Sequence, residues 1–215
     1  MTYTILATDA GHRWMGVATA SFSLAVGAGV PALRVGVGAV ASQAYTNRAL
    51  RAHALDALAA GQDPADILAG LPAIDPGAAK RQVAVLTPNG TGQAHTGAEC
   101  SDWAGHRTAE NLVAAGNLLA GPGVLDAMIE ACARAQAGNA APDPGPQALA
   151  RALVAGLAAG EAAGGDRRGR QSVALLVGRT DSIADREPLA VDLRVDDHPD
   201  PVRELTRLLD LAGAV

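Results

Sequence analysis

The sequence predicts an α+β protein built as a four-layer αββα sandwich, with two mostly antiparallel sheets between two layers of helices. Three observations lead to this prediction. Strand-like stretches come in groups joined by short turns, which favours antiparallel pairing. Pairs of stretches with helical spacing stand between these groups, and a last helix closes the chain. No linker divides the 215 residues, so we expect a single domain over residues 1–215.

The first strands are predicted at Thr2–Thr8 and Trp14–Ala20, on either side of the polar turn Asp9–His12. Asp and Gly in this turn suit the backbone geometry of a hairpin. The glycine-rich stretch Phe22–Pro31 is typical of a loop or a bulged strand. Alternating Val, Gly and Ala over Arg34–Ser42 then predict a third strand with close backbone approach on one face.

Two helices are expected next. Apolar residues recur at helical spacing from Leu50 to Leu58, and Gly61 ends this first helix. Asp63-Pro64 is a typical helix start, because Asp caps free N–H groups and Pro suits the first helical position. The second helix should run to about Leu71.

Pro88-Asn89-Gly90 predicts a hairpin turn, and the rest of the chain shows the same patterns of alternation and helical spacing. The elements expected are strands Gln82–Thr87 and Thr91–Thr96, a strand within Glu110–Leu119, helices Pro122–Ala137 and Gln147–Ala163 with a Pro-rich surface connection at Ala140–Pro146, strands Ser172–Gly178 and Leu189–Val195, and a last helix from Asp200. Cys132 falls on the apolar face of its helix, so we expect it in the core.

Composition and charge exclude several classes of function. A net charge of −5 and 2% aromatic residues argue against a nucleic-acid partner, which needs basic and stacking groups. No apolar run approaches the roughly 20 residues of a membrane span, and Asp9 interrupts the first one, unlike a signal peptide. Cys100 and Cys132 are too few for a disulfide framework. We expect a soluble, cytoplasmic protein with no membrane partner.

Thr2 is the leading candidate for chemistry. A small residue after Met1 normally permits removal of the methionine, which would leave Thr2 with a free α-amine beside its hydroxyl. One residue would then carry both a nucleophile and a base. An α-amine has a pKa of about 7.7–8, which suits a base at ordinary pH. The alternative is that Thr2 only starts an edge strand, and position alone favours this alternative.

Three other patterns are candidates for a functional site. Three arginines stand among glycines in Gly164–Ser172, where they could clamp a carboxylate or phosphate; the alternative is a solvated loop. His95, Cys100 and His106 lie close in sequence, but their spacing matches no zinc pattern, so we expect no metal. A pocket wall carrying His106 is the favoured interpretation. Gly36–Ala41 resembles a dinucleotide fingerprint, but no helix follows it, so we expect no cofactor.

Several segments carry a family resemblance that covers nearly the whole chain. They are Gly36–Asn47 (GVGAVASQAYTN), His95–Cys100 (HTGAEC), Trp103–Thr108 (WAGHRT), Gly116–Gly121 (GNLLAG), Gly164–Ser172 (GGDRRGRQS) and Val191–His198 (VDLRVDDH). In them the chain closely resembles the domain-of-unknown-function 1028 family, which belongs among the N-terminal-nucleophile (Ntn) hydrolases. The resemblance implies an Ntn-hydrolase-like αββα sandwich, and it implies no substrate.

A looser resemblance to proteasome-type Ntn hydrolases, which use an N-terminal threonine, suggests roles for single positions. The lysine of that family falls near Arg34, which can polarise Thr2 or hold an anion but cannot shuttle a proton. The glycine that lends a backbone N–H to the oxyanion falls near Ala41–Gln43. Its later aspartate corresponds loosely to Asp166. These departures argue against a peptidase mechanism and are compatible with a small substrate.

The function we expect is hydrolysis of a non-peptide C–N bond, in an amide, ureide or cyclic imide, of a small acidic substrate. The alternative is a non-catalytic member of the fold that binds a ligand or partner. The candidate catalytic residues are Thr2, Ser42, Gln43, Asn117 and Asp166, and the candidate substrate-binding residues are Arg34, Tyr45, His106, Arg167 and Arg168. We also expect a homo-oligomer.

Overall fold

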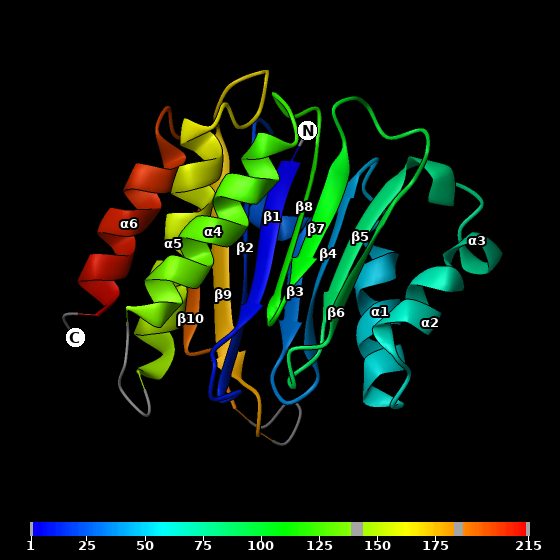
Figure 1. Ribbon diagram of the computed structural model, residues 1–215, viewed down its shortest axis with the longest axis horizontal. Helices are drawn as coiled ribbons and strands as arrows, with labels where there is room; N and C mark the ends of the chain where they lie inside the picture. Colours follow the sequence, from blue (N-terminus) through cyan, green and yellow to red (C-terminus); the bar gives the residue numbers. More distant parts are fainter. Residues whose placement is uncertain (1, 139–143, 183–186, 214–215) are drawn as a thin grey trace.

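Two antiparallel sheets lie face to face in the computed structural model, which describes residues 2–138, 144–182 and 187–213 (Figure 1). One sheet has six strands in the order β10-β9-β2-β1-β8-β7, and the other has four in the order β3-β4-β5-β6. The strands are β1 Thr2–Thr8, β2 Trp14–Ser21, β3 Pro31–Arg34, β4 Gly38–Ala44, β5 Arg81–Leu86, β6 Gly92–Thr96, β7 Gly105–Ala109, β8 Leu112–Asn117, β9 Ser172–Arg179 and β10 Val191–Val195. Every pair of neighbouring strands is antiparallel.

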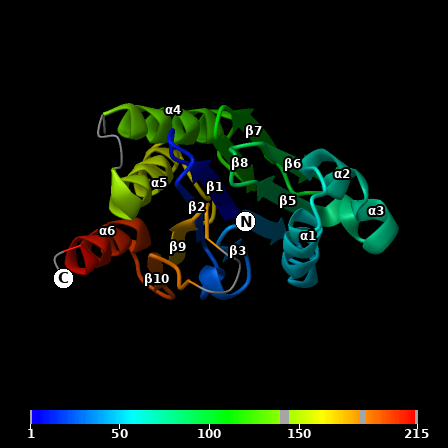
Figure 2. The same cartoon turned by 90° about the horizontal axis from the view of Figure 1, so that it is seen from below.

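Helices cover the outer face of each sheet, which gives four layers (Figure 2). The helices are α1 Ala49–Ala59, α2 Pro64–Ala69, α3 Leu71–Ile74, α4 Gly123–Ala137, α5 Gly145–Ala162 and α6 Pro201–Ala212, with short 3-10 turns η1 Val26–Ala28 and η2 Ala78–Lys80. Helices α4, α5 and α6 pack on the six-stranded sheet, and α1 and α2 pack on the four-stranded sheet. The predicted α+β sandwich with two antiparallel sheets is therefore confirmed.

Three apolar cores hold the layers together. Ile5 and Leu153 belong to the core between the six-stranded sheet and its helices. Leu6, the next residue of β1, points the other way and belongs to the core between the two sheets. Val40 belongs to the core under α1 and α2. This alternation follows from the strand period of two, and it explains why β1 and β2 are buried on both faces.

The first hairpin forms as predicted, and its turn is fixed by a carboxylate. The side chain of Asp9 accepts hydrogen bonds from the backbone N–H groups of Arg13 at 2.8 Å and Trp14 at 2.7 Å. Such local bonds replace the strand ladder where the chain reverses. The turn therefore joins β1 to β2, and pairing with β8 on the other side places β1 inside its sheet.

The predicted strand at Arg34–Ser42 is wrong in its extent, because two strands share this region. β3 ends at Arg34 and β4 begins at Gly38. Gly36 has a φ of 71°, a left-handed conformation that glycine adopts without strain, and it turns the chain between the two strands. Strand β7 was not predicted at all. Its residues, Gly105–Ala109, form a partly exposed edge strand without apolar alternation.

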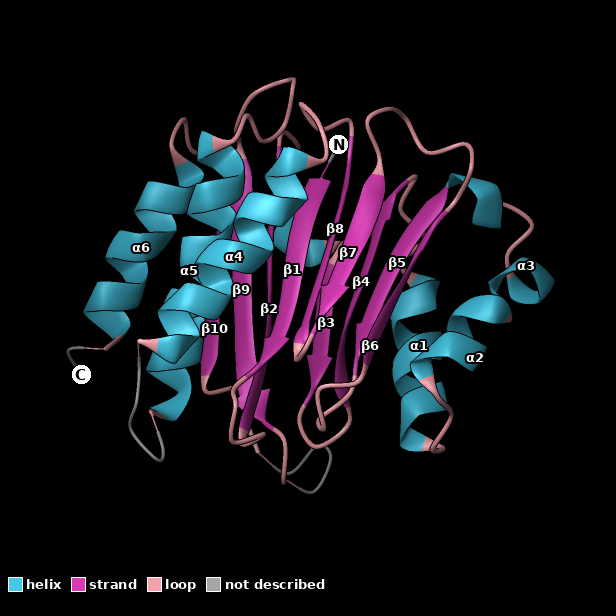
Figure 3. Ribbon diagram, in the orientation of Figure 1, coloured by secondary structure: helices cyan, strands magenta, loops and turns pink. Residues whose placement is uncertain are grey.

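The remaining predicted helices and strands are present with shifted ends, and α3 is an additional short helix. Cys132 is fully buried in the core under α4, as predicted. Met1 and most of the predicted connection Ala140–Pro146 lie outside the described residues. Among the described residues, no helix has both the length and the apolar character needed to cross a membrane. Figure 3 shows the strands of the two sheets lying between the two layers of helices.

Candidate active site

Nine of the ten candidate site residues gather at one end of the sandwich, where β1 begins. The antiparallel registers bring this about. Thr2 pairs with Asn117, and Gly116 pairs with Gly105, the residue before His106. The loops that follow β4 and precede β9 end at the same side (Figure 1). Residues far apart in the sequence are thus brought together because strand ends of both sheets coincide there.

Thr2 is held at this end by groups from three other strands. Its side-chain hydroxyl donates to the hydroxyl of Ser21, the last residue of β2, at 3.2 Å. Its carbonyl oxygen lies 3.4 Å from the side-chain nitrogen of Gln43 and 3.5 Å from that of Asn117. Thr2 is 6% exposed. The hydroxyl and the first peptide group are therefore fixed in a polar, mostly buried setting.

Gln43 and Asn117 both lie against a buried residue that sequence analysis missed. The side-chain oxygen of Gln82 accepts from the Gln43 nitrogen at 2.8 Å and from the Asn117 nitrogen at 3.0 Å. The side-chain oxygen of Gln43 accepts from the hydroxyl of Thr4 at 2.6 Å. No sequence signal marks Gln82, because a single polar residue at the start of a strand has no periodic pattern.

Ser42 does not face Thr2, which corrects the expectation that its backbone could stabilise an oxyanion there. Side chains alternate along a strand, and Gln43 points toward β1, so Ser42 points to the opposite face. The Ser42 N–H donates to the carbonyl of Val30 at 3.0 Å, and its hydroxyl donates to the carbonyl of Asn47 at 2.9 Å. Ser42 therefore supports the loop after β4.

Asp166 anchors the arginine-rich loop to the end of β2. Its buried carboxylate accepts from the backbone N–H groups of Phe22 and Arg168, each at 2.8 Å. The guanidinium of Arg168 lies 3.2 Å from the same carboxylate and 5.7 Å from the centre of the Phe22 ring. Arg167 is exposed, and the described residues include no ion pair for its side chain. Of the two candidate cations, Arg167 is the one left to meet an anion.

Tyr45 and His106 lie on the other side of the Thr2 end. Tyr45 is 59% exposed, and its carbonyl accepts from the guanidinium of Arg81, which fixes the loop after β4. His106 is half-buried, and its Nδ1 lies 2.9 Å from the hydroxyl of Thr96. Burial lowers the pKa of His106, and the nearby His95 and Arg107 lower it further. His106 is therefore a neutral hydrogen-bonding group near pH 7.

Arg34 is not part of this arrangement, contrary to expectation. It pairs with Gly38 at the far end of β4, about 16 Å along the strand from Gln43. Its guanidinium forms an ion pair with Asp56 of α1 at 2.9 Å. The sequence comparison failed here because a turn at Gly36 reverses the chain just after Arg34.

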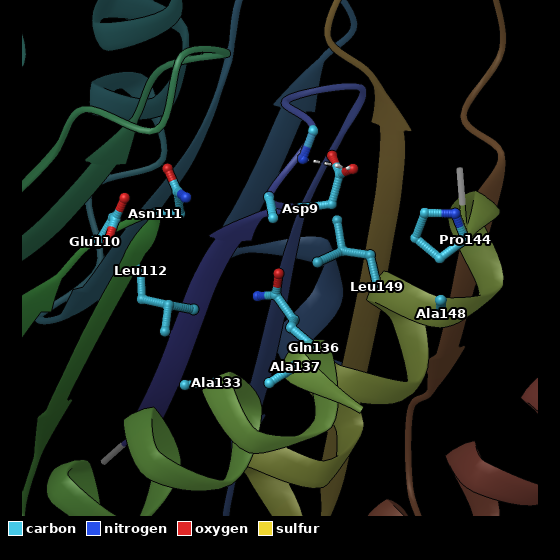
Figure 4. A pocket seen from close by; sticks show the side chains of 12 residues that line it. Asp9, Glu110, Asn111, Leu112, Ala133, Gln136, Ala137, Pro144, Ala148 and Leu149 are labelled. Carbon is cyan, nitrogen blue, oxygen red and sulfur yellow. Dashed lines mark hydrogen bonds between the residues drawn. The ribbon is translucent and has the colours of Figure 1, made fainter. Parts of the chain in front are cut away.

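A cavity of about 330 Å³ lies at the opposite end of β1, roughly 20 Å from Thr2 along the strand. Figure 4 shows Asp9 from the first turn, Asn111 before β8, Gln136 near the end of α4 and Leu149 of α5 around it. The carboxylate of Asp9 is already bonded within its own turn. This cavity is therefore separate from the Thr2 cluster.

The described residues contain no group of three or more His, Cys, Asp or Glu side chains placed to hold a metal ion. Cys100 lies near the Thr2 end, and its thiol donates to the carbonyl of Arg81 at 3.4 Å. Burial raises the pKa of Cys100. A buried, protonated thiol is a poor nucleophile, so Thr2 remains the better candidate.

Comparison with known proteins supports one family. A model of the family described as "Family of unknown function (DUF1028)" matches residues 2–205. The crystal structure of protein SPO2555 from Silicibacter pomeroyi, which is assigned to the same family, is similar over 99% of this chain and 89% of that chain. Its sequence is 33% identical, and the TM-score is 0.83. A search of curated proteins found no match.

Proposed function

Because the chain belongs to the DUF1028 family, whose description assigns no function, we propose from its own residues that it is an Ntn-type amidohydrolase with Thr2 as the nucleophile. The observation that carries this proposal is the setting of Thr2. It is the first residue of a central strand, its hydroxyl lies 3.2 Å from that of Ser21, and two side-chain amides lie beside it. The four-layer arrangement of the sheets and helices supports the Ntn-like assignment.

The chemistry begins with loss of Met1, which frees the α-amine of Thr2. The Thr2 oxygen attacks the carbonyl carbon of the substrate, and the α-amine takes the hydroxyl proton, directly or through one water. The C–N bond then breaks, and the leaving nitrogen receives that proton. Water attacks the acyl-threonine ester, which releases the acid and restores the hydroxyl.

The oxyanion that forms in this attack needs hydrogen-bond donors nearby. Asn117 is the donor that we assign, because its side-chain nitrogen is only loosely bonded to the Thr2 carbonyl, at 3.5 Å. Gln43 contacts the Thr2 carbonyl from the facing sheet and helps to fix the first peptide group. Asp166 acts indirectly, because its carboxylate bonds the arginine-rich loop to Phe22, the residue after Ser21.

The substrate class follows from the side chains around this end. Arg167 offers a cation for an acidic group of the substrate. Arg168 belongs to the same loop, and its charge is balanced by Asp166. Tyr45, which follows β4, and His106 of β7 lie at the same end of the sandwich. We therefore propose a small acidic amide, ureide or cyclic imide as substrate.

A second candidate function is ligand binding without catalysis, and two observations favour it. Thr2 is only 6% exposed, and the cavity of about 330 Å³ lies at the other end of β1. A protein that used this cavity would not need a free amine on Thr2. The two candidates therefore differ in what they require of the chain's first residues.

Periodate separates the two candidates, because it cleaves the carbon–carbon bond between a free amine and a neighbouring hydroxyl. The denatured protein should react at Thr2 if Met1 is removed, and intact mass should report the lost fragment. Thr2→Ser should react as well, whereas Thr2→Ala should not. A denatured protein that resists periodate and keeps Met1 would rule out this mechanism.

Hydrolysis tests the function itself. We expect a screen of small acidic amides, ureas and cyclic imides to yield a substrate that the wild type hydrolyses and Thr2→Ala does not. Thr2→Ser should retain part of the activity, since it keeps a hydroxyl and an amine. Equal rates for the wild type and Thr2→Ala would end the assignment of Thr2.

A further inference from the structure

Gln82 lies at the centre of the polar contacts between the two sheets, although it touches neither solvent nor Thr2. It is the second residue of β5 and is fully buried. Its side-chain oxygen accepts one hydrogen bond from Gln43 of its own sheet and one from Asn117 of the facing sheet, at 2.8 and 3.0 Å. A single oxygen therefore joins the two amides that flank Thr2.

The nitrogen of the same side chain is bonded just as fully. It lies 2.9 Å from the hydroxyl of Thr96, from the carbonyl of Gly105 and from the carbonyl of Gly116. Turning this amide over would set its N–H groups against the donors of Gln43 and Asn117 and its oxygen against two carbonyls. The surroundings thus allow one orientation, and Gln82 contacts β4, β6, β7 and β8 through it.

This orientation decides where the remaining N–H groups of Gln43 and Asn117 point. Each amide nitrogen carries two hydrogens. With one hydrogen directed to Gln82, the Asn117 nitrogen can direct the other toward the Thr2 carbonyl, 3.5 Å away. The Gln43 nitrogen shares its other hydrogen between the carbonyls of Ala115, at 3.2 Å, and Thr2, at 3.4 Å. An apolar side chain at position 82 could fill the same space, but it could not select between orientations of its neighbours.

We propose that Gln82 is a positioning residue, which orients Gln43 and Asn117 and through them holds the first peptide group of Thr2, the residue that carries the hydroxyl. The proposal rests on the function proposed for Thr2. It adds a requirement that the Thr2 strand alone does not reveal, namely that the nucleophile depends on a buried residue of the other sheet.

Gln82→Met tests this proposal, because methionine has a similar size and offers neither the amide donor nor the amide acceptor. Val85→Ala is the matched control. Val85 is on the same strand and equally buried, but it faces α1 and α2, so its truncation destabilises the protein without touching the amides. Gln82→Glu is the conservative variant, since burial favours the protonated carboxyl, which keeps an acceptor for Gln43 and Asn117 and a donor for one of the two carbonyls.

The first measurement is hydrogen exchange of the side-chain amides of Gln43 and Asn117, followed by NMR in nitrogen-15-labelled native protein. We expect slow exchange in the wild type, in Val85→Ala and in Gln82→Glu, and exchange at least tenfold faster in Gln82→Met. The second is the rate of periodate cleavage of native protein at Thr2. We expect it to change at least fivefold in Gln82→Met and less than twofold in Val85→Ala.

Equal exchange in Gln82→Met and the wild type would overturn the proposal, as would the same changes in Val85→Ala. If Gln82→Met does not fold, Gln82→Glu decides, since rapid exchange at Gln43 and Asn117 in that variant contradicts the proposed role of the acceptor. The exchange measurement needs no free amine and no turnover. Its failure is therefore distinguishable from failure of Thr2 as a nucleophile, which the activity of Thr2→Ala reports.

Discussion

The side-chain hydroxyl of Thr2 lies 3.2 Å from that of Ser21, across the pairing of the first two strands. Both residues are buried, and Thr2 is the donor in this contact. An attacking hydroxyl must hold one rotamer while its proton leaves. Ser21 can hold that rotamer, and it can donate to the Thr2 oxygen once the proton has gone.

Ser21→Ala should therefore slow hydrolysis. Loss of one hydrogen bond of about 1 kcal/mol corresponds to a roughly fivefold lower rate. We expect the fall in kcat, with KM nearly unchanged, because Ser21 contacts the nucleophile. Ser23→Ala, in the exposed loop that follows, should behave as the wild type. A full rate in Ser21→Ala would show that this contact has no part in the reaction.

His106 should be neutral near pH 7, with its proton on Nε2. The hydroxyl of Thr96 accepts from Gln82, so its own hydrogen is available for Nδ1 of His106. Nitrogen-15 chemical shifts of the imidazole report both the tautomer and the pKa. Thr96→Val removes the donor and should shift the tautomer balance toward Nδ1–H. An Nδ1–H tautomer in the wild type would contradict the direction of this hydrogen bond.

The lowered pKa of His106 also makes stability depend on pH. The unfolded chain binds a proton near the ordinary histidine pKa of about 6.5, whereas the folded protein binds it only at lower pH. The free energy of unfolding should therefore decrease as the pH falls from above 6.5 toward the folded pKa. Urea unfolding of wild type and His106→Gln across this range should show a weaker dependence in the variant.

Asp75 should be the most important charged residue for the loop after β4. Its nearly buried carboxylate lies 2.8 Å from the guanidinium of Arg81 and accepts from the Asn47 side chain at 2.9 Å. Asp75→Ala would leave these donors unpaired, at a cost of roughly 2–4 kcal/mol of unfolding free energy. Asp56→Ala, which breaks the exposed pair with Arg34, should cost at most about 1 kcal/mol. Denaturant melts would refute this ranking if the two variants were equally stable.

Acid should weaken the same contact. The hydrogen bonds from Arg81 and Asn47 hold the pKa of Asp75 far below its ordinary value. A depressed carboxyl pKa stabilises the folded state at pH values above the unfolded pKa of about 3.9, and this contribution is lost as the pH falls toward the folded pKa. The stability difference between wild type and Asp75→Asn should therefore shrink below about pH 4.

Arg167→Gln should weaken binding of an acidic substrate, because this exposed arginine has no ion pair within the described residues. We expect KM to rise about five- to tenfold, with kcat within twofold of the wild type. Arg34→Gln is the control, since that side chain is paired with Asp56 at the far end of β4. Similar KM values for Arg167→Gln and the wild type would place the acidic group elsewhere.

The layers and most helices and strands could be predicted from the sequence, because amphipathic helices and alternating strands leave periodic patterns of apolar residues. It failed where local geometry overrides pattern. Gly36 reverses the chain inside an apparently continuous strand, and the polar edge strand Gly105–Ala109 has no alternation to detect. The first error is an unrecognised glycine turn, and the second is a strand that depends on pairing with β8 more than on its own residues.

The candidate site was predictable where strand ends could be inferred. The sequence predicted that Thr2 begins a strand and offered Asn117 as an oxyanion donor, and the pairing of β1 with β8 brings the two residues together. Gln82 was not predictable, since its partners come from four other strands and only the docked sheets bring them together. Ser42 was assigned to the wrong face of β4, because its neighbour Gln43 is the residue that faces Thr2. Arg34 was assigned to the wrong end of the sandwich, because the turn at Gly36 was not recognised.

Thr2 touches Asn117 of its own sheet and Gln43 of the facing sheet, so the arrangement belongs to neither layer alone. A folding intermediate with both sheets formed but not yet docked would be chemically inert. If warming separates the two sheets before the strands unfold, activity should be lost at a lower temperature than the β-sheet signal in circular dichroism.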